Sequence, residues 1–325
     1  MKIFRNRLAA FVLLLLISPA VFANVTFDRP ITIVVSFPTG GDTDVIARVL
    51  AEKLSKRINQ NVLVLNKSGA SGTIGNRFVA ESKPDGYTLL LTPSTIITSK
   101  FVLGDRISYD IFKDFTPIVK VIRETNLFIV VNSSTNVRTN KELIDAIKQG
   151  RIRSYATPGS GSPMNMVGEY YKKELGLDIV QVPYRGNFPA VTALLSNEVS
   201  MMITGLFPVI SAIESKKVNV IAVASDKRSQ FAPEIPTLSE TGLTPADFSG
   251  WFALMGPAGM NSNIVNSLNY HINEILKDQE VRTKFSGLAY STAGGSPKDM
   301  ETAFRNLYNK FDNNIKKFKI IVNVE

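Results

Sequence analysis

Short apolar runs alternate with helix-like patterns along the chain, and this alternation constrains the fold more than any other feature of the sequence. Residues 31–37 are apolar and rich in β-branched side chains, as in a strand that is buried on both faces. After a glycine turn, apolar residues recur at helical spacing from Val45 to Leu54. The same succession returns further along the chain. It predicts an α/β fold with largely parallel sheets and right-handed crossovers.

The predicted strands fall into two groups. The first group covers 31–37, 62–65 and 87–92, and the second covers 127–131, 154–157, 179–183, 199–204 and 218–224. After Ser225 the pattern changes to long helices, at 264–276 and from Pro297 to about Phe318. We therefore expect two α/β lobes, with the C-terminal part packed back onto the first lobe. The chain then crosses twice between the lobes, near 121–126 and 222–226, and a hinge of this kind places a ligand in the cleft. A single larger α/β domain is the alternative that periodicity leaves open.

Local signals predict where several helices begin and end. Thr139 and Glu142 have the spacing of a capping box. Ser162 is followed by Pro163, which suits the first position of a helix. Gly176 suits the end of that helix, because glycine readily adopts the left-handed conformation found there.

The first 23 residues have the composition of a secretory signal peptide. A basic segment with Lys2, Arg5 and Arg7 precedes a short apolar run at 8–17, and small residues end at Ala23. The apolar run is well short of the about 20 residues that a membrane-spanning helix needs. We predict export to the periplasm with cleavage after Ala23. Because the chain has no cysteine for a lipid anchor, the mature protein is expected to be soluble.

The charge distribution does not favour nucleic acid as a partner. The formal net charge is +9, and the three basic residues of the first 23 positions leave +6 for the rest of the chain. Lysine and arginine are scattered, with only a mild cluster at 316–319, whereas a nucleic-acid interface gathers them on one face. A weak positive field helps to attract anionic solutes.

Glycine-containing turns follow several predicted strands. They lie at 38–41 after the first strand, at 66–72 after the second, and at 157–162 and 184–186 in the second group. Ligands of open α/β sheets lie at the carboxyl ends of strands, and the N–H groups at the start of a helix attract anions. Each turn alone is also an ordinary connector. Together the turns predict a cleft that holds a carboxylate through backbone N–H and hydroxyl groups.

Sequence signals for enzymes and nucleotide-binding proteins are missing. The chain has no cysteine and a single histidine, His271, which lies in an amphipathic helical pattern and is not expected to be catalytic. No Gly-x-Gly-x-x-Gly motif follows a strand, and no Walker signature occurs. Trp251, the only tryptophan, is interpreted as a core or lobe-interface aromatic rather than a pocket wall. We therefore predict a protein that is not an enzyme and that uses no cofactor or metal.

Seven segments occur in a characteristic order that covers nearly the whole chain after residue 23. They are RPITIVVSFPTGGDTDVIAR at 29–48, NKSGASGTIG at 66–75, KPDGYTLL at 83–90, YATPGSGS at 155–162, VPYRG at 182–186, IPTLSETGL at 235–243 and GPAG at 256–259. With these segments the chain resembles the Bordetella uptake gene (Bug) family, the extracytoplasmic solute receptors of tripartite tricarboxylate transporters.

The resemblance implies a type II periplasmic binding-protein fold, in which two α/β lobes joined by a double-crossover hinge close on a small solute. Lobe 1 is expected to comprise residues 24–122 and 226–325, and lobe 2 residues 123–225. Family ligands are typically di- and tricarboxylates, acidic amino acids or aromatic acids. The ligand contacts carried over by position are Phe37, Pro38, Thr39, Gly40, Gly41, Asp42 and Ala70 in lobe 1, and Thr157, Ser160, Ser162, Asn165, Tyr184 and Thr204 in lobe 2.

Three of these positions depart from what is usual in the family. Asp42 stands where a small neutral residue is common, and we interpret it as a cap of the following helix, because an acidic residue at a helix start is favourable. Asn165 stands where histidine is common and keeps hydrogen-bonding capacity. Thr204 replaces an aspartate that is common at the end of a strand in lobe 2. Where that aspartate binds a ligand amine, its loss argues against an amino acid ligand.

The function implied by the resemblance is capture of a small organic anion, a carboxylate, for a tripartite tricarboxylate-type transporter. The expected partners are the ligand and the membrane subunits of the transporter, and the receptor is expected to be a monomer. The alternative is a sensor subunit that presents its ligand to the periplasmic domain of a sensor kinase in a two-component system.

Overall fold

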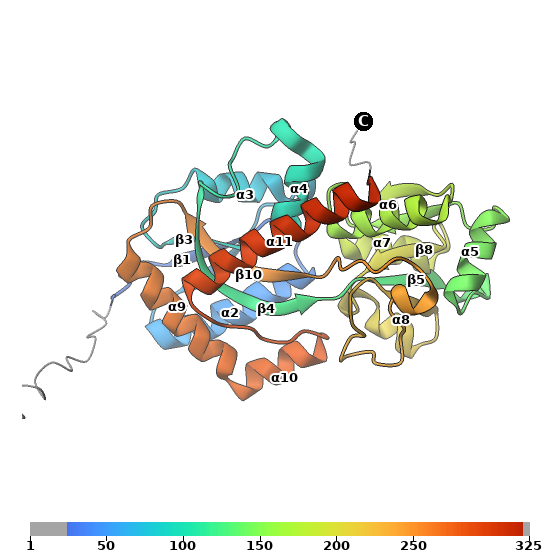
Figure 1. Cartoon of the computed structure of the whole chain (residues 1–325). Helices are drawn as coiled ribbons and strands as arrows, with labels where there is room; N and C mark the ends of the chain where they lie inside the picture. Colours follow the sequence, from blue (N-terminus) through green and yellow to red (C-terminus); the bar gives the residue numbers. More distant parts are fainter. Residues whose placement is uncertain (1–24, 321–325) are drawn as a thin grey trace, which may run out of the picture.

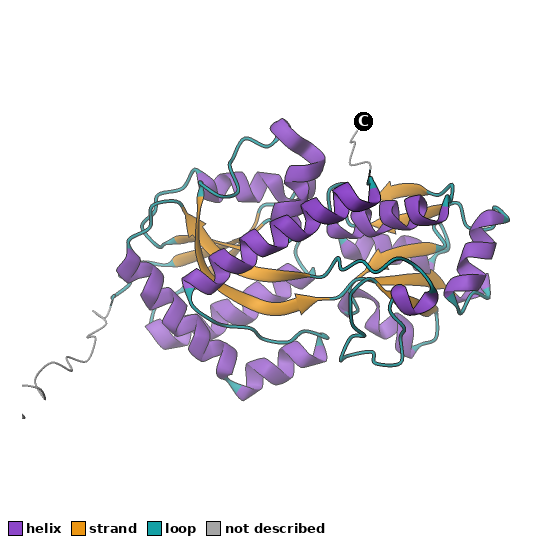
Figure 2. Cartoon of the chain, viewed as in Figure 1, coloured by secondary structure: helices purple, strands orange, loops and turns teal. Residues whose placement is uncertain are grey.

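The computed structural model describes residues 25–320, so the predicted signal peptide lies outside the described residues. The chain forms two five-stranded sheets that lie side by side, each with helices packed against it (Figures 1 and 2). Among residues 25–320, no helix combines the length and the apolar composition that crossing a bilayer requires.

The first sheet has the strand order β2-β1-β3-β10-β4. Three of its strands are parallel, with Ile31 opposite Val62 and Thr32 opposite Thr88. β10 runs antiparallel to both of its neighbours. The strand bounds are β1 Ile31–Val35, β2 Val62–Asn66, β3 Thr88–Pro93, β4 Phe115–Thr125 and β10 Gly250–Pro257.

The second sheet has the order β7-β6-β8-β5-β9 and the same plan. β7, β6 and β8 are parallel, and β5 runs antiparallel to both β8 and β9. The strand bounds are β5 Phe128–Asn132, β6 Ser154–Thr157, β7 Val180–Pro183, β8 Met201–Thr204 and β9 Val218–Val223.

Each sheet therefore contains one strand that runs against the others, and the prediction of largely parallel sheets is corrected in this respect. The exceptions are β5 and β10. Each is the first strand that the chain forms after it crosses from one sheet to the other. Such a strand starts at the edge where the parallel strands end. It needs no helical crossover, so its direction is reversed.

The helices cover both faces of each sheet. Ile33 and Val35 point toward α2 and α9, whereas Val34 between them points toward α4 and α11. Successive strand residues alternate between faces, so both faces of a central strand become apolar. The main helices are α2 Asp42–Ile58, α3 Thr73–Ala80, α4 Thr95–Leu103, α5 Asn140–Lys148, α6 Pro163–Leu175, α7 Asn187–Leu195, α8 Ile210–Glu214, α9 Ser262–Lys277, α10 Gln279–Gly287 and α11 Pro297–Phe318.

The predicted helix signals are confirmed. Thr139 and Glu142 make both hydrogen bonds of a capping box at the start of α5. Ser162 accepts a hydrogen bond from the Asn165 N–H group at the start of α6, and Gly176 ends that helix in the left-handed conformation.

The chain crosses between the sheets first where β4 continues into β5. After β9 it stays against the second sheet, because the Val223 N–H group donates to Pro236 and the Leu238 N–H group donates to Val223. It rejoins the first sheet at β10, which begins at Gly250, further along the chain than the expected boundary at residue 226.

Helix α11 spans both lobes. Phe304 packs against Trp251 of β10, with ring centroids 5.6 Å apart. One end of the helix reaches the second lobe, where Phe318 lies 4.7 Å from the ring of Tyr170 on α6. Figure 1 shows this helix running from the side of α9 to α6. The apolar core is thus continuous between the lobes, and Trp251 is part of it, as predicted.

Gly168 in α6 is required by the packing of the helix on β6. A Cβ atom at this position would lie 2.2 Å from the ring of Tyr155, which is fully buried. We expect Gly168→Ala to destabilise the protein by about 2 kcal/mol, because overpacking outweighs the gain in helix propensity. The midpoint of urea unfolding measures this loss.

The matched control is Gly287→Ala at the end of α10, where a Cβ atom would meet nothing within 4 Å. We expect this variant to unfold within about 0.5 kcal/mol of the wild type. Equal midpoints for the two variants would contradict the packing of Gly168 against Tyr155.

Candidate functional site

A cavity of about 230 Å³ lies between the two sheets, at the ends where their parallel strands point. Both lobes contribute to its wall. The first contributes the turn after β1 and the turn after β3, and the second contributes the turns after β6, β7 and β8. Thr125 and Leu127, at the crossing from β4 to β5, also line the cavity, as do Phe252 of β10 and Tyr290. The cavity therefore occupies the cleft that the sequence predicts.

Four helices begin at this cavity, and they are α2, α4, α6 and α7. No side chain caps α2, α4 or α7, whereas Ser162 caps α6. The first N–H groups of a helix have no partner within the helix, and they carry the positive end of its dipole. Their convergence makes this cavity suited to hydrogen-bond acceptors and negative charge.

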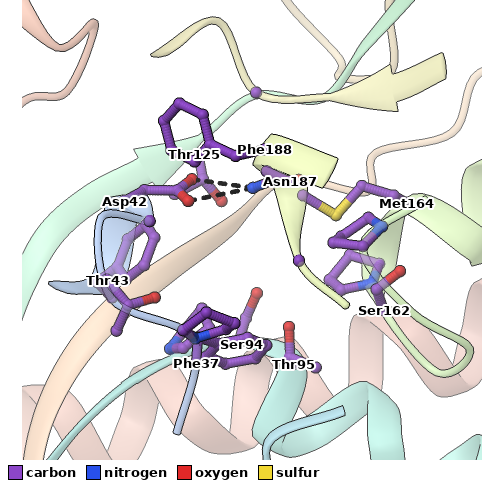
Figure 3. A pocket seen from close by; sticks show the side chains of 18 of the residues that line it. Phe37, Asp42, Thr43, Ser94, Thr95, Thr125, Ser162, Met164, Asn187 and Phe188 are labelled. Carbon is purple, nitrogen blue, oxygen red and sulfur yellow. Dashed lines mark hydrogen bonds between the residues drawn. The ribbon is translucent and has the colours of Figure 1, made fainter. Parts of the chain in front are cut away.

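Most of the remaining wall is apolar. Phe37, Phe188 and Phe252 line it together with Met164 and several prolines. Figure 3 shows Phe37 and Phe188 on opposite sides of the Asp42 side chain in the view. A ligand in this cavity is therefore surrounded by hydrocarbon, with a few polar groups to orient it.

The turn between β1 and α2 is fixed by Asp44. Its carboxylate accepts the Gly40 N–H at 2.9 Å, two hydrogen bonds from Arg48 and one from the Asn66 amide. Burial alone would raise the pKa of Asp44, but these hydrogen bonds lower it below its usual value. The carboxylate thus stays ionised and holds Gly40 in a left-handed conformation, with φ of 85°.

Asp42 does not cap helix α2, and the sequence-based interpretation is wrong on this point. It is the first residue of the helix, and Gly41 stands at the capping position. Its carboxylate instead accepts a hydrogen bond from the Asn187 amide, at 3.1 and 3.3 Å to the two oxygens, and one from the Tyr290 hydroxyl at 2.9 Å. Figure 3 shows the contact with Asn187. It joins the first turn of α2 to the first residue of α7, across the two lobes.

Tyr290 is a fixed donor to this carboxylate. Burial, and then the negative charge of Asp42, raise the pKa of Tyr290 well above its usual value. The hydroxyl therefore keeps its proton at neutral pH. Its ring packs edge-on against Phe252 of the cavity wall, with ring centroids 5.6 Å apart.

Six of the thirteen predicted ligand contacts line the cavity. They are Phe37, Pro38, Thr39, Gly41, Asp42 and Ser162. Gly40 belongs to the same turn as the first five, but its N–H group is bonded to Asp44.

Two predicted contacts, Ala70 and Ser160, lie in loops that meet across the lobes. The hydroxyl group of Ser71, next to Ala70, donates a hydrogen bond to the Ser160 carbonyl group. A Cβ atom at Gly159 would lie 3.0 Å from the Ser71 hydroxyl oxygen. These loops close the cleft at one side, outside the cavity wall.

The remaining predicted contacts are occupied within lobe 2 or buried behind the wall. Asn165 donates to the Tyr155 hydroxyl, and the Tyr184 hydroxyl donates to Glu198. Thr157 is fully buried and accepts from Gln181 at 2.6 Å. The hydroxyl of Thr204 is buried with no hydrogen-bond partner among the described residues.

The sequence predictions missed several residues of the wall. Ser94 and Thr95 follow β3 at the start of α4. The sequence does carry a signal for them, because two hydroxyl residues closely follow a predicted strand. Arg185 lies within the predicted turn at 184–186 and Asn187 directly follows it, but neither was predicted as a ligand contact. Tyr290, Phe252 and Gly205 come from distant parts of the chain and had no local signal.

His271 lies on α9 and is not among the residues that line the cavity. Burial, and then the nearby charge of Arg57, lower the pKa of this histidine. Among residues 25–320, no cluster of three or more histidine, aspartate or glutamate side chains is arranged to hold a metal ion.

Comparison with known proteins gives consistent results. The sequence profile described as tripartite tricarboxylate transporter family receptor matches residues 46–317. Protein BugT of Bordetella pertussis is 35% identical over 288 residues, which cover 86% of this chain and 88% of BugT. The structure of periplasmic binding protein BugD matches with a TM-score of 0.84 at 28% identity, over 92% of this chain and 100% of that one.

A structure of R. palustris Rpa4515 with adipate matches with a TM-score of 0.85 at 29% identity, over 91% of this chain and 99% of that one. The expected periplasmic binding-protein fold is confirmed by these matches and by the two sheets.

The unpaired hydroxyl of Thr204 gives a prediction about stability. Thr157, on the neighbouring strand β6, provides the control. Thr204→Val removes a buried polar group that has no partner, so we expect the free energy of unfolding to rise by about 1 kcal/mol. Thr157→Val, at the end of β6, removes a hydroxyl that accepts from Gln181, and it should lower that free energy by about 1 kcal/mol.

Both threonines are fully buried, so the two substitutions differ mainly in the hydrogen bond lost. Denaturant unfolding of both variants beside the wild type measures the difference. Destabilisation by Thr204→Val would contradict an unpaired hydroxyl at this site.

Proposed function

The chain belongs to the tripartite tricarboxylate transporter family of receptors, and on that premise we propose that it captures a small carboxylate in the periplasm and delivers it to the membrane subunits of such a transporter. The observation that carries this proposal is the convergence of four helix N-termini on one cavity between the lobes. Rpa4515, which has the same fold, was solved with the dicarboxylate adipate, and this supports the ligand class.

The ligand carboxylate is bound, in this proposal, at the starts of α4 and α6. Ser94 and Thr95 offer hydroxyl groups there beside the uncapped N–H groups of α4. Ser162 lines the same region from the second lobe, where its hydroxyl donates to the Gly159 carbonyl group at 2.8 Å and caps α6. This region attracts the carboxylate more strongly than the start of α2, where the Asp42 carboxylate already supplies a negative charge.

Arg185 adds a positive charge at the rim of the cavity. It is exposed, and no ion pair joins it to another of residues 25–320. An unpaired arginine at the mouth of an apolar cavity raises the local concentration of anions and speeds their association. We propose that Arg185 draws the carboxylate in and contacts it at the rim.

Closure of the two lobes gives the membrane subunits a signal that the receptor is loaded. Because the wall combines residues of both lobes, a ligand has its full set of contacts only when the lobes are together. A ligand shifts the equilibrium toward the closed form by as much as its affinities for the two forms differ. Transporter subunits that recognise the closed surface then accept only loaded receptor.

Isothermal titration of residues 24–325 with a panel of carboxylates tests the proposal, and the panel includes adipate, hexanoate and amino-substituted acids. We expect at least one of them to bind with micromolar or tighter affinity. Arg185→Gln should weaken that binding about threefold to tenfold, mainly through slower association, because a rim charge acts on the encounter.

Arg282→Gln is the matched control, since it removes the same charge from exposed α10, away from the cavity. It should bind as the wild type does. Failure of every carboxylate to bind, together with binding of an amine that lacks a carboxylate, would refute the proposed ligand class.

A further inference from the structure

The cavity contains a second polar region, around Asp42, whose chemistry is opposite to that of the carboxylate region. Resting on the function proposed above, we propose that the carboxylate ligand also carries a positively charged nitrogen, and that Asp42 binds this nitrogen. Asp42 is then the residue that selects amine-bearing carboxylates over plain acids.

Asp42 is a cavity-lining carboxylate held only by neutral donors. Its hydrogen-bond partners are the Asn187 amide and the Tyr290 hydroxyl, and no lysine, arginine or histidine among residues 25–320 forms an ion pair with it. A carboxylate has about four acceptor positions, and these contacts use three of them. The negative charge therefore lacks a cationic partner and retains capacity for a further donor.

Asp44, two residues later in the same helix, is a carboxylate whose charge and acceptor positions are all paired within the protein. Asp44 pairs with Arg48 and accepts four hydrogen bonds in all. Its function is to fix the turn. Asp42 has no such cation, although it is partly buried at a largely apolar cavity wall, and buried or partly buried charges are normally paired.

Asn187 points to the same kind of ligand. Its amide nitrogen donates to Asp42, but its amide oxygen is buried and has no hydrogen-bond partner among the described residues. An unpaired buried acceptor costs about 1–3 kcal/mol. Turning this amide about its last bond, with loss of its own donation to Asp42, would let its oxygen accept from an ammonium group bound at Asp42. Asp42 and Asn187 thus both have acceptor capacity that no donor among the described residues fills.

The walls around Asp42 strengthen this preference. Phe37, Phe188 and Phe252 line the cavity, and an ammonium group is attracted to the faces of aromatic rings. A hydrocarbon environment also lowers the effective dielectric constant, which strengthens an ion pair relative to water. A second carboxylate on the ligand would instead meet the repulsion of Asp42 in the same environment.

The two polar regions lie apart in the cavity. In Figure 3, Ser94 and Thr95 lie below the Asp42–Asn187 pair, with the ring of Phe37 beside them. The ligand class that matches both regions and the wall is a small amino-carboxylate with an apolar body, carrying its carboxylate toward α4 and its ammonium toward α2.

Matched pairs of probes test this inference on the wild-type chain, residues 24–325. The pairs are 6-aminohexanoate with hexanoate and leucine with 4-methylpentanoate, and adipate serves as a dicarboxylate. We expect at least one amino acid to bind ten times or more tightly than its amine-free partner and than adipate, as measured by isothermal titration.

Asp42→Asn keeps the size and the acceptor oxygen that Asn187 and Tyr290 require, but it removes the charge. We expect it to lower the affinity for the amino acid at least tenfold while leaving the affinity for the amine-free acid unchanged or higher. Thermal unfolding without ligand checks that the variant is folded. The control is Asp145→Asn on exposed α5, which removes an equal charge far from the cavity and should change neither affinity.

The outcomes separate this inference from the proposed function. If an amine-free acid or adipate binds as tightly as every amino acid, the role of Asp42 is refuted and the carboxylate receptor stands. The role is also refuted if Asp42→Asn weakens both members of a pair equally, because the effect is then structural. If no carboxylate binds, with or without an amine, the proposed function itself fails.

Discussion

The hydrogen bond between Asp42 and Asn187 is the contact on which the geometry of the cavity depends. It joins the first turns of two helices from different lobes, and neither helix has a side-chain cap. Two helix N-termini that face each other carry like partial charges, which would otherwise repel. The carboxylate between them offsets this repulsion. This side chain therefore joins the lobes at the cavity, in addition to the contacts made by Ser71 and by α11, and it leaves a negative charge beside the ligand space.

The position of Asp42 is fixed by the glycine turn before it and by Tyr290, a residue far along the chain. Before it, the glycine turn is held by Asp44, which is itself bound by Arg48 and by Asn66 at the end of β2. Behind it, the buried Tyr290 donates to the same carboxylate from the C-terminal part of the chain. The parallel strands that end at this edge bring these parts together, because strand direction decides where every turn lies. The sheet topology thus brings these residues together, and their hydrogen bonds then fix the position of the Asp42 carboxylate.

The sequence predicted those features that depend on local pattern. The strand at 154–157 and the ends of α6 were predicted correctly, because periodicity, proline and glycine act within a few residues. Helix α4 was missed because its apolar residues are spread around the helix rather than gathered on one face, so it shows no amphipathic pattern. The site was predicted only in part for a different reason. The partners of Asp42 are 145 and 248 residues away along the chain, and a local pattern contains no signal for contacts at such separations.

The place of Asp42 on the first lobe and of Asn187 on the second determines how a charged ligand group would act on closure. The sequence argument against an amino acid ligand rested on Thr204, whose hydroxyl is now seen to be buried behind the cavity wall. Asp42 supplies a carboxylate from the first lobe instead, and its partner Asn187 lies in the second. An ammonium group between them would replace a direct contact between the lobes with two contacts through the ligand. Such a ligand favours the closed form only if its bonds to both residues outweigh the single hydrogen bond that it displaces. A charged nitrogen meets this requirement, because in its bond to Asp42 both donor and acceptor are charged, and it also has a donor left for the Asn187 oxygen. A neutral or anionic group at the same place does not, so closure itself would discriminate between ligands.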